Sequence, residues 1–124
     1  MIQVVTHSES VQERLREAFR ACPDDFELMQ RAIANDTVSL YLIKGEDYYL
    51  TVAGEVVGDS YFVWAVVGTG AVQATRELAT YVKGSGLKAI TTKTYFPLVA
   101  RLLKRLGKVT TNEHGDHQFL RWEV

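Results

Sequence analysis

The sequence predicts a single α/β domain with a mixed, mostly antiparallel central sheet and helices on both of its faces. Segments with strand-like alternation and segments with apolar residues at helical spacing follow one another along the chain. Three strands in succession, then a strand–helix–strand crossover and a final hairpin, predict more antiparallel than parallel pairs. The 124 residues, 47% of them apolar, suit one core, so we expect one domain over residues 1–124.

The first half of the chain is expected to contain two helices between strands. Ser10 and Glu13 form a capping-box pattern, and an apolar stripe continues from there to Cys22, which predicts the first helix. Pro23 suits the first position of a second helix that ends near Asn35. The strands expected in this half are residues 1–6, 37–43, 48–53 and 60–67.

The strand over residues 60–67 is almost continuously apolar, as expected at the centre of a sheet that is covered on both faces. Gly54 and Glu55, shortly before it, predict a bulge or a turn. The later elements expected are helices over residues 71–83 and 96–106 and strands over residues 87–92, 109–112 and 117–123. The expected order is therefore β-α-α-β-β-β-α-β-α-β-β.

Charge and apolar runs narrow the functional classes. Lys and Arg number 14 against 15 for Asp and Glu, so the net charge of −1 makes nucleic acid an unexpected partner. The longest apolar run, residues 61–67, is far shorter than the roughly 20 residues that span a bilayer, so no membrane segment is expected. Cys22, the only cysteine, lies on an apolar stripe, which predicts a buried structural thiol and a reducing, cytoplasmic setting. His114 and His117 lie in a short hairpin whose side chains diverge, so no metal site is expected.

A glycine loop joins the central strand to the next helix in the second half of the chain. Gly68-Thr69-Gly70 follows the apolar strand, and Gly84 and Gly86 close the helix. From Ser60 onward, about half the chain, this arrangement resembles the GNAT superfamily of N-acetyltransferases, of which the chain looks like a short, divergent member. The later residues that match the family pattern are Leu102, Leu106 and Gly107.

The resemblance implies acetyl-CoA or CoA as the cofactor, with its pyrophosphate at the start of the helix that follows the loop. Backbone N–H groups at a helix start favour an anion, and glycine lets a phosphate approach closely. The residues that the resemblance places at the cofactor are Val66, Gly68, Thr69, Gly70, Ala71, Val72 and Gln73.

The chain departs from the family pattern at three positions. Ala65 stands where the loop has Arg or Gln, and no basic residue occurs from residue 60 to residue 75. Leu103 stands where a tyrosine often protonates the leaving thiolate, and Phe96 stands where the family has asparagine. The usual general acid is therefore missing.

Tyr95 is the candidate catalytic residue that remains, because a phenol within hydrogen-bond reach can protonate a thiolate. Tyr41 and Tyr61 are further candidates for the same role. For each of the three, a structural role in the core or at its rim is the alternative.

Two functions remain open on the sequence. One is an acetyl-CoA-dependent N-acetyltransferase that acetylates an unidentified small-molecule or protein amine. The other is a catalytically degenerate scaffold that binds a host or partner protein, since small GNAT-like bacteriophage effectors and virion components are similar in compactness; such a protein would act in the host cytoplasm. A homodimer formed by edge strands is compatible with either function. The aromatic residues considered as anchors for a partner are Tyr48, Tyr49, Tyr95 and Trp122.

Overall fold

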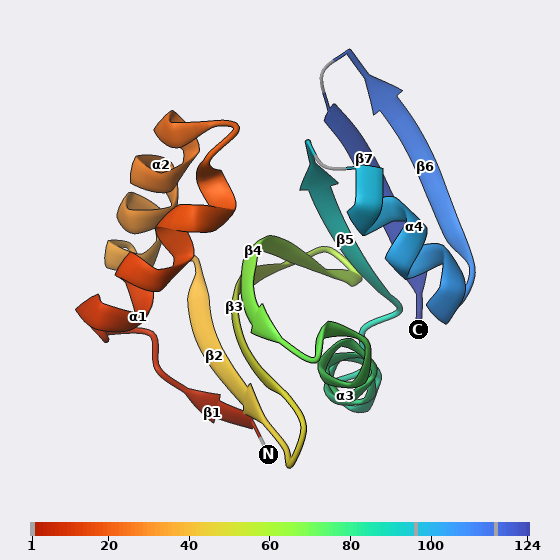
Figure 1. Ribbon diagram of the computed structural model, residues 1–124, viewed down its shortest axis with the longest axis horizontal. Coiled ribbons are helices and arrows are strands. Elements are labelled where there is room, and N and C mark those ends of the chain that lie inside the picture. Colours follow the sequence, from red (N-terminus) through yellow and green to blue (C-terminus); the bar gives the residue numbers. More distant parts are fainter. Residues whose placement is uncertain (1, 96, 116) are drawn as a thin grey trace.

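The computed structural model describes residues 2–95, 97–115 and 117–124 (Figure 1). Its strands are β1 (Ile2–Val4), β2 (Ser39–Lys44), β3 (Tyr49–Val57), β4 (Ser60–Thr69), β5 (Ala89–Thr94), β6 (Val109–His114) and β7 (His117–Glu123). Its helices are α1 (Glu9–Arg14), the 3₁₀ helix η1 (Leu15–Phe19), α2 (Pro23–Ala34), α3 (Ala71–Gly84) and α4 (Pro97–Leu106). The order of elements expected from the sequence is confirmed, with η1 added.

The strands form one sheet in the order β1-β2-β3-β4-β5-β7-β6. Within the described residues, β4 and β5 pair in parallel and every other neighbouring pair is antiparallel. The expected mixed, mostly antiparallel sheet is therefore confirmed. The helices α1, η1 and α2 cover one face, and α3 and α4 cover the other (Figure 1).

Each face of the sheet has its own apolar core. Leu15 and Met29 are completely buried on the face of α1 and α2. Ile43 and Val52 are completely buried on the face of α3 and α4. Burying each such side chain contributes roughly 2 kcal/mol, so both helical layers hold the central strands in place.

The first helix begins earlier and ends earlier than the sequence predicts. The N-cap is Ser8, whose hydroxyl accepts a hydrogen bond from the Val11 N–H at 3.4 Å, while the Ser10 hydroxyl contacts that of Ser8 at 3.1 Å. The capping box at Ser10 and Glu13 was therefore wrong, because Glu13 instead pairs with Arg16. The α-helix gives way to η1 after Arg14.

Within the described residues, no helix is long and apolar enough to cross a membrane.

A β-bulge in β4 interrupts the regular pairing of the sheet. Ala53 of β3 pairs with Ala65, but the next residue, Gly54, pairs with Val63, so Trp64 is an extra residue in β4. The parallel pairing of β4 with β5 ends at the same place, with Val63 opposite Thr92. Beyond that point the two strands diverge (Figure 1).

The irregularity expected at Gly54 and Glu55 lies on the opposite strand. β3 runs without interruption through both residues. Gly54 has a packing role instead, because a Cβ there would lie 2.4 Å from the ring of Tyr61. A residue larger than glycine would displace this buried tyrosine.

Candidate functional site

The divergence of β4 from β5 opens the centre of the sheet, where a cavity of about 520 Å³ lies. Trp64 and Val66 line it from β4, Thr92 lines it from β5, and Tyr95 lines it from the residue directly after β5. Cys22, between η1 and α2, closes one side. Two residues that the sequence assigned to cofactor binding and to proton transfer, Val66 and Tyr95, therefore line one cavity.

Tyr95 lies beside a cation and a second ring. The Lys93 Nζ is 5.5 Å from the centre of the Tyr95 ring and 3.5 Å from Oδ2 of Asp25 on α2. The ring of His117 lies 5.6 Å from that of Tyr95. Burial opposes the charge on Lys93, but the Asp25 carboxylate and the Tyr95 hydroxyl outweigh burial and raise the pKa of Lys93. Lys93 therefore keeps its positive charge beside the Tyr95 ring.

The Cys22 thiol forms part of the cavity wall and stays protonated. Burial raises the pKa of Cys22, and the Asp25 carboxylate raises it further. The thiolate is the reactive form of cysteine, so these surroundings suppress nucleophilic chemistry. The structural role expected from the sequence fits this setting, although the side chain is only half-buried.

The two loop glycines are required by close packing against the turn between β2 and β3. Gly70, at φ 69°, is the left-handed N-cap of α3, and a Cβ there would lie 2.6 Å from the carbonyl oxygen of Asp47. Gly68, at φ 145°, has even less room, because its Cβ would lie 2.0 Å from the carbonyl oxygen of Tyr49. The Gly-x-Gly sequence is therefore explained by packing before any ligand is considered.

The start of α3 is exposed and has no side-chain cap. The first N–H groups of a helix have no partner within the helix, so this end can accept an anion. Thr69, Val72 and Gln73 are exposed there, and Arg76, the nearest basic residue along the helix, is exposed one turn later. The first turn thus offers backbone donors and a partial positive charge but no cationic side chain.

The other residues weighed on the sequence lie away from the opening. Tyr61 is 6% exposed, burial strongly raises its pKa, and it packs in the core under α3 with Tyr41 6.4 Å away. Leu103, at the family's tyrosine position, is buried in the same core. Trp122 is buried as well, so it cannot anchor a partner protein.

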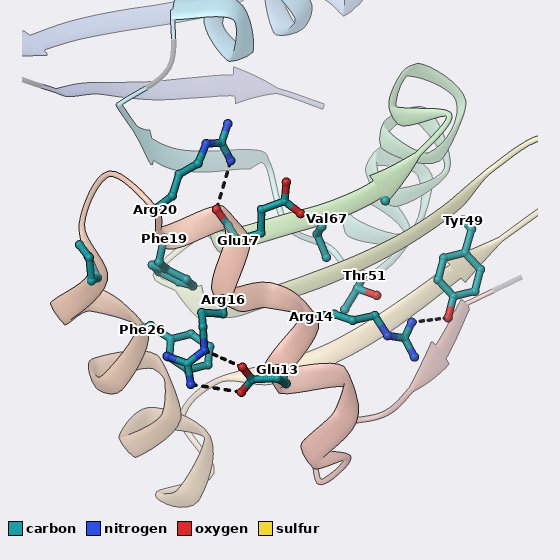
Figure 2. A pocket seen from close by; sticks show the side chains of 12 residues that line it. Glu13, Arg14, Arg16, Glu17, Phe19, Arg20, Phe26, Tyr49, Thr51 and Val67 are labelled. Carbon is teal, nitrogen blue, oxygen red and sulfur yellow. Dashed lines mark hydrogen bonds and ion pairs between the residues drawn. The ribbon is translucent and has the colours of Figure 1, made fainter.

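A second cavity, of about 830 Å³, lies on the same face between η1 and the sheet (Figure 2). Thr51 of β3 and Val67 of β4 line it from the sheet. Its charged lining residues all come from α1, η1 and the residue that follows: Glu13, Arg14, Arg16, Glu17 and Arg20. Phe19 and Arg20 line both cavities, so the two are neighbours across the end of η1.

The sequence did not single out this charged lining. Arg14 and Glu17 are three residues apart, so a helical projection places them on one side, but it does not show that this side borders a cavity rather than solvent. The predicted cofactor site came from the order of elements together with the family resemblance, whereas this cavity depends on how α1 and η1 pack on the sheet.

The comparisons with known proteins support the fold. No family model and no curated protein sequence matches the chain. An acetyltransferase from Bacillus subtilis solved in complex with CoA superposes with a TM-score of 0.71 at 10% identity, over 99% of this chain and 97% of that one. An acetyltransferase of the GNAT family from Staphylococcus aureus gives 0.59 at 13% identity, over 99% of both chains.

The aminoglycoside 6'-N-acetyltransferase from Enterococcus faecium is also similar, with a TM-score of 0.56 at 12% identity, over 99% of this chain and 96% of that one. Each likeness extends over nearly the whole of both chains, beyond the half that carried the resemblance in sequence. The chain therefore has the mixed-sheet fold of the GNAT acetyltransferases.

Proposed function

We propose that this protein transfers an acetyl group from acetyl-CoA to an amine at the opening between β4 and β5. The observation that carries the proposal is the bulge at Trp64, which ends the β4–β5 pairing at Val63 and leaves Val66 and Tyr95 on one cavity. An acetyl thioester supplies an electrophilic carbonyl and a thiol leaving group. The chain must supply positions for both reactants and a proton for the sulfur.

The open edge of β4 suits the amide-bearing arm of CoA. Within the described residues, no strand pairs with β4 on the β5 side beyond Val63, so backbone N–H and C=O groups there are available. The uncapped start of α3 suits the pyrophosphate. The residues proposed to hold CoA are Val66, Gly68, Thr69, Gly70, Ala71, Val72 and Gln73.

Tyr95 is proposed as the general acid. In the transfer, the amine nitrogen bonds to the acetyl carbon, the carbon–sulfur bond breaks, and the amine proton passes to water. The Tyr95 hydroxyl gives its proton to the departing sulfur, and Lys93 stabilises the resulting phenolate, which water reprotonates.

The start of α3 also favours the second candidate, a scaffold that binds a partner protein. Its first turn carries no cation, and the two loop glycines already have a packing role. A scaffold of this kind would keep the fold and the opening without binding CoA.

Thermal unfolding with millimolar CoA and acetyl-CoA separates the two candidates. A ligand present at a hundredfold excess over its Kd stabilises the native state by about 2.7 kcal/mol, which raises Tm by several degrees for a chain of this size. Absence of any shift, confirmed by calorimetric titration, would leave the scaffold as the function.

Charge changes at Gln73 locate the pyrophosphate. Gln73→Glu should stabilise α3 by about 0.5 kcal/mol through the helix dipole, yet weaken CoA binding by about tenfold or more through repulsion. Gln73→Lys should destabilise α3 and strengthen CoA binding. Because stability and affinity move in opposite directions, misfolding cannot mimic this result.

Tyr95→Phe tests the proton donor. The variant should bind CoA like the parent and lose on the order of 100-fold in kcat. Unchanged kcat would remove Tyr95 from the mechanism without affecting the CoA site.

A further inference from the structure

The second cavity has the arrangement of a binding site for a small zwitterion. Its apolar surface comes from Phe19, Phe26 and Val67, two of which are almost completely buried. Figure 2 shows Arg14 and Tyr49 at one end and Glu17 and Arg20 at the other. A cavity with apolar lining, a guanidinium at one end and a carboxylate at the other suits a molecule with an apolar body and both a negative and a positive group.

The Arg14 end suits a carboxylate. The Arg14 guanidinium donates a hydrogen bond to the neutral hydroxyl of Tyr49 at 2.6 Å, and among the described residues no carboxylate pairs with it. Arg16 differs, because Glu13 neutralises it through two hydrogen bonds of 2.6 and 3.1 Å. Arg14 therefore retains N–H donors and an uncompensated charge, and a carboxylate is the partner that its planar fork fits best.

Thr51 supplies an independent indication at the same end. Its side chain is completely buried, lines the cavity and has no hydrogen-bond partner for Oγ1 among the described residues. Thr51 lies two residues after Tyr49 on β3, so both side chains project from the same face of the strand. A buried hydroxyl without a partner costs free energy, and a carboxylate held by Arg14 would accept its hydrogen bond.

The Glu17 end suits an ammonium group. No ion pair joins Glu17 to another described residue, and the Arg20 guanidinium beside it donates to the Glu17 backbone carbonyl at 3.1 Å. Phe19 and Arg20 also line the cavity at the strand opening. An amine at the Glu17 end would therefore lie toward the place where we locate the acetyl group.

We propose that this cavity binds an α-amino acid with an apolar or aromatic side chain, its carboxylate on Arg14 and Thr51 and its amine toward Glu17. The amino acid is then the acceptor of the acetyl group, which rests on the proposed function; the binding site itself does not. L-phenylalanine is the probe that tests all three contacts.

Calorimetric titration without CoA tests the site alone. L-phenylalanine should bind, whereas L-phenylalaninamide, which lacks the carboxylate, and 3-phenylpropionate, which lacks the amine, should each bind about tenfold more weakly or worse. Absence of L-phenylalanine binding at millimolar concentration would overturn the proposal. Equal binding of the acid and the amide would overturn it as well.

Variants assign the contacts. Arg14→Gln should weaken L-phenylalanine by about tenfold and leave L-phenylalaninamide unchanged, while Glu17→Gln should weaken L-phenylalanine and leave 3-phenylpropionate unchanged. Arg31→Gln, at an exposed arginine of α2 that lines neither cavity, should alter neither ligand. Equal losses for the acid and the amide in Arg14→Gln would contradict the assignment.

Thr51→Val keeps the shape of the side chain without its hydroxyl. It should fold and weaken L-phenylalanine severalfold, which separates loss of the contact from loss of the fold. CoA binding should be the same in all these variants. If L-phenylalanine binds through Arg14 but CoA does not bind, the site stands and acetyl transfer fails. If acetyl-CoA is consumed with other amines but L-phenylalanine does not bind, acetyl transfer stands and the amino-acid site fails.

Discussion

The Thr92 hydroxyl donates a hydrogen bond to the backbone carbonyl of Val63 at 3.0 Å, at the last position where β4 and β5 pair. Thr92→Val should therefore cost about 1 kcal/mol of stability. Thr51→Val should be neutral or stabilising by up to about 1 kcal/mol, because the Thr51 hydroxyl is buried without a partner. Urea unfolding measures both changes in stability, as shifts of the denaturation midpoint in variants whose m value, the dependence of the unfolding free energy on urea, is unchanged. Equal losses in the two variants would show that Thr51 has a partner after all.

The N-cap of α1 gives a second matched pair. Ser8→Ala should cost about 0.5 to 1 kcal/mol, because the Val11 N–H loses its acceptor. Ser10→Ala should cost less, since the Ser10 hydroxyl only contacts that of Ser8. The denaturation midpoints of the two variants give the two losses of stability. A larger loss for Ser10→Ala than for Ser8→Ala would support the capping box that the sequence suggested.

Two glycines at opposite ends of α3 should respond to alanine with opposite sign. Gly70→Ala should destabilise by at least about 1 to 2 kcal/mol, because φ is 69° and the new Cβ meets the Asp47 carbonyl and Tyr48. Gly84→Ala should stabilise by about 0.5 to 1 kcal/mol, since nothing lies within 4 Å of its Cβ position and its φ is not positive. Thermal unfolding of the two variants checks the sign of each change.

The pH dependence of Cys22 reports on Asp25. Burial and the Asp25 carboxylate both raise the pKa of Cys22, so alkylation of the native thiol should reach half its maximal rate at a higher pH than in the unfolded chain. Asp25→Asn should move this midpoint to lower pH, because the thiolate then forms without a neighbouring negative charge and with Lys93 still close. The measurement is the rate of iodoacetamide labelling against pH. A midpoint that does not move would mean that Asp25 does not act on the thiol.

The order of the elements could be predicted from the sequence because each boundary has a local cause. Pro23 begins α2, and Gly70 precedes α3, as their backbone preferences dictate. The continuous apolar run of β4 likewise predicted a central strand covered on both faces. The capping of α1 could not be predicted, since Ser8 and Ser10 are equally good caps in isolation.

The site could be predicted only in part. Val66 and Tyr95 line one cavity because it lies where β4 and β5 diverge; the family resemblance placed Val66 at the cofactor, but the sequence could not place Tyr95 beside it. The extra residue, Trp64, leaves no local signal, because a bulge is defined by its pairing with β3. The charged residues of the second cavity have helical spacing, but periodicity does not reveal that they border a cavity, because that depends on how the helix packs on the sheet.

The bulge also determines what the loss of one codon would do. Trp64 and Ala65 both pack on the α1–α2 face, whereas Val63 packs on the α3–α4 face. A reading frame without codon 64 would join Val63 directly to Ala65. Successive side chains of β4 would then alternate between the two faces of the sheet, and every remaining side chain would keep its present face. Only Lys93 and Thr94 of β5 remain beyond Thr92, so this in-frame deletion would extend the β4–β5 pairing by at most two residues and narrow the opening.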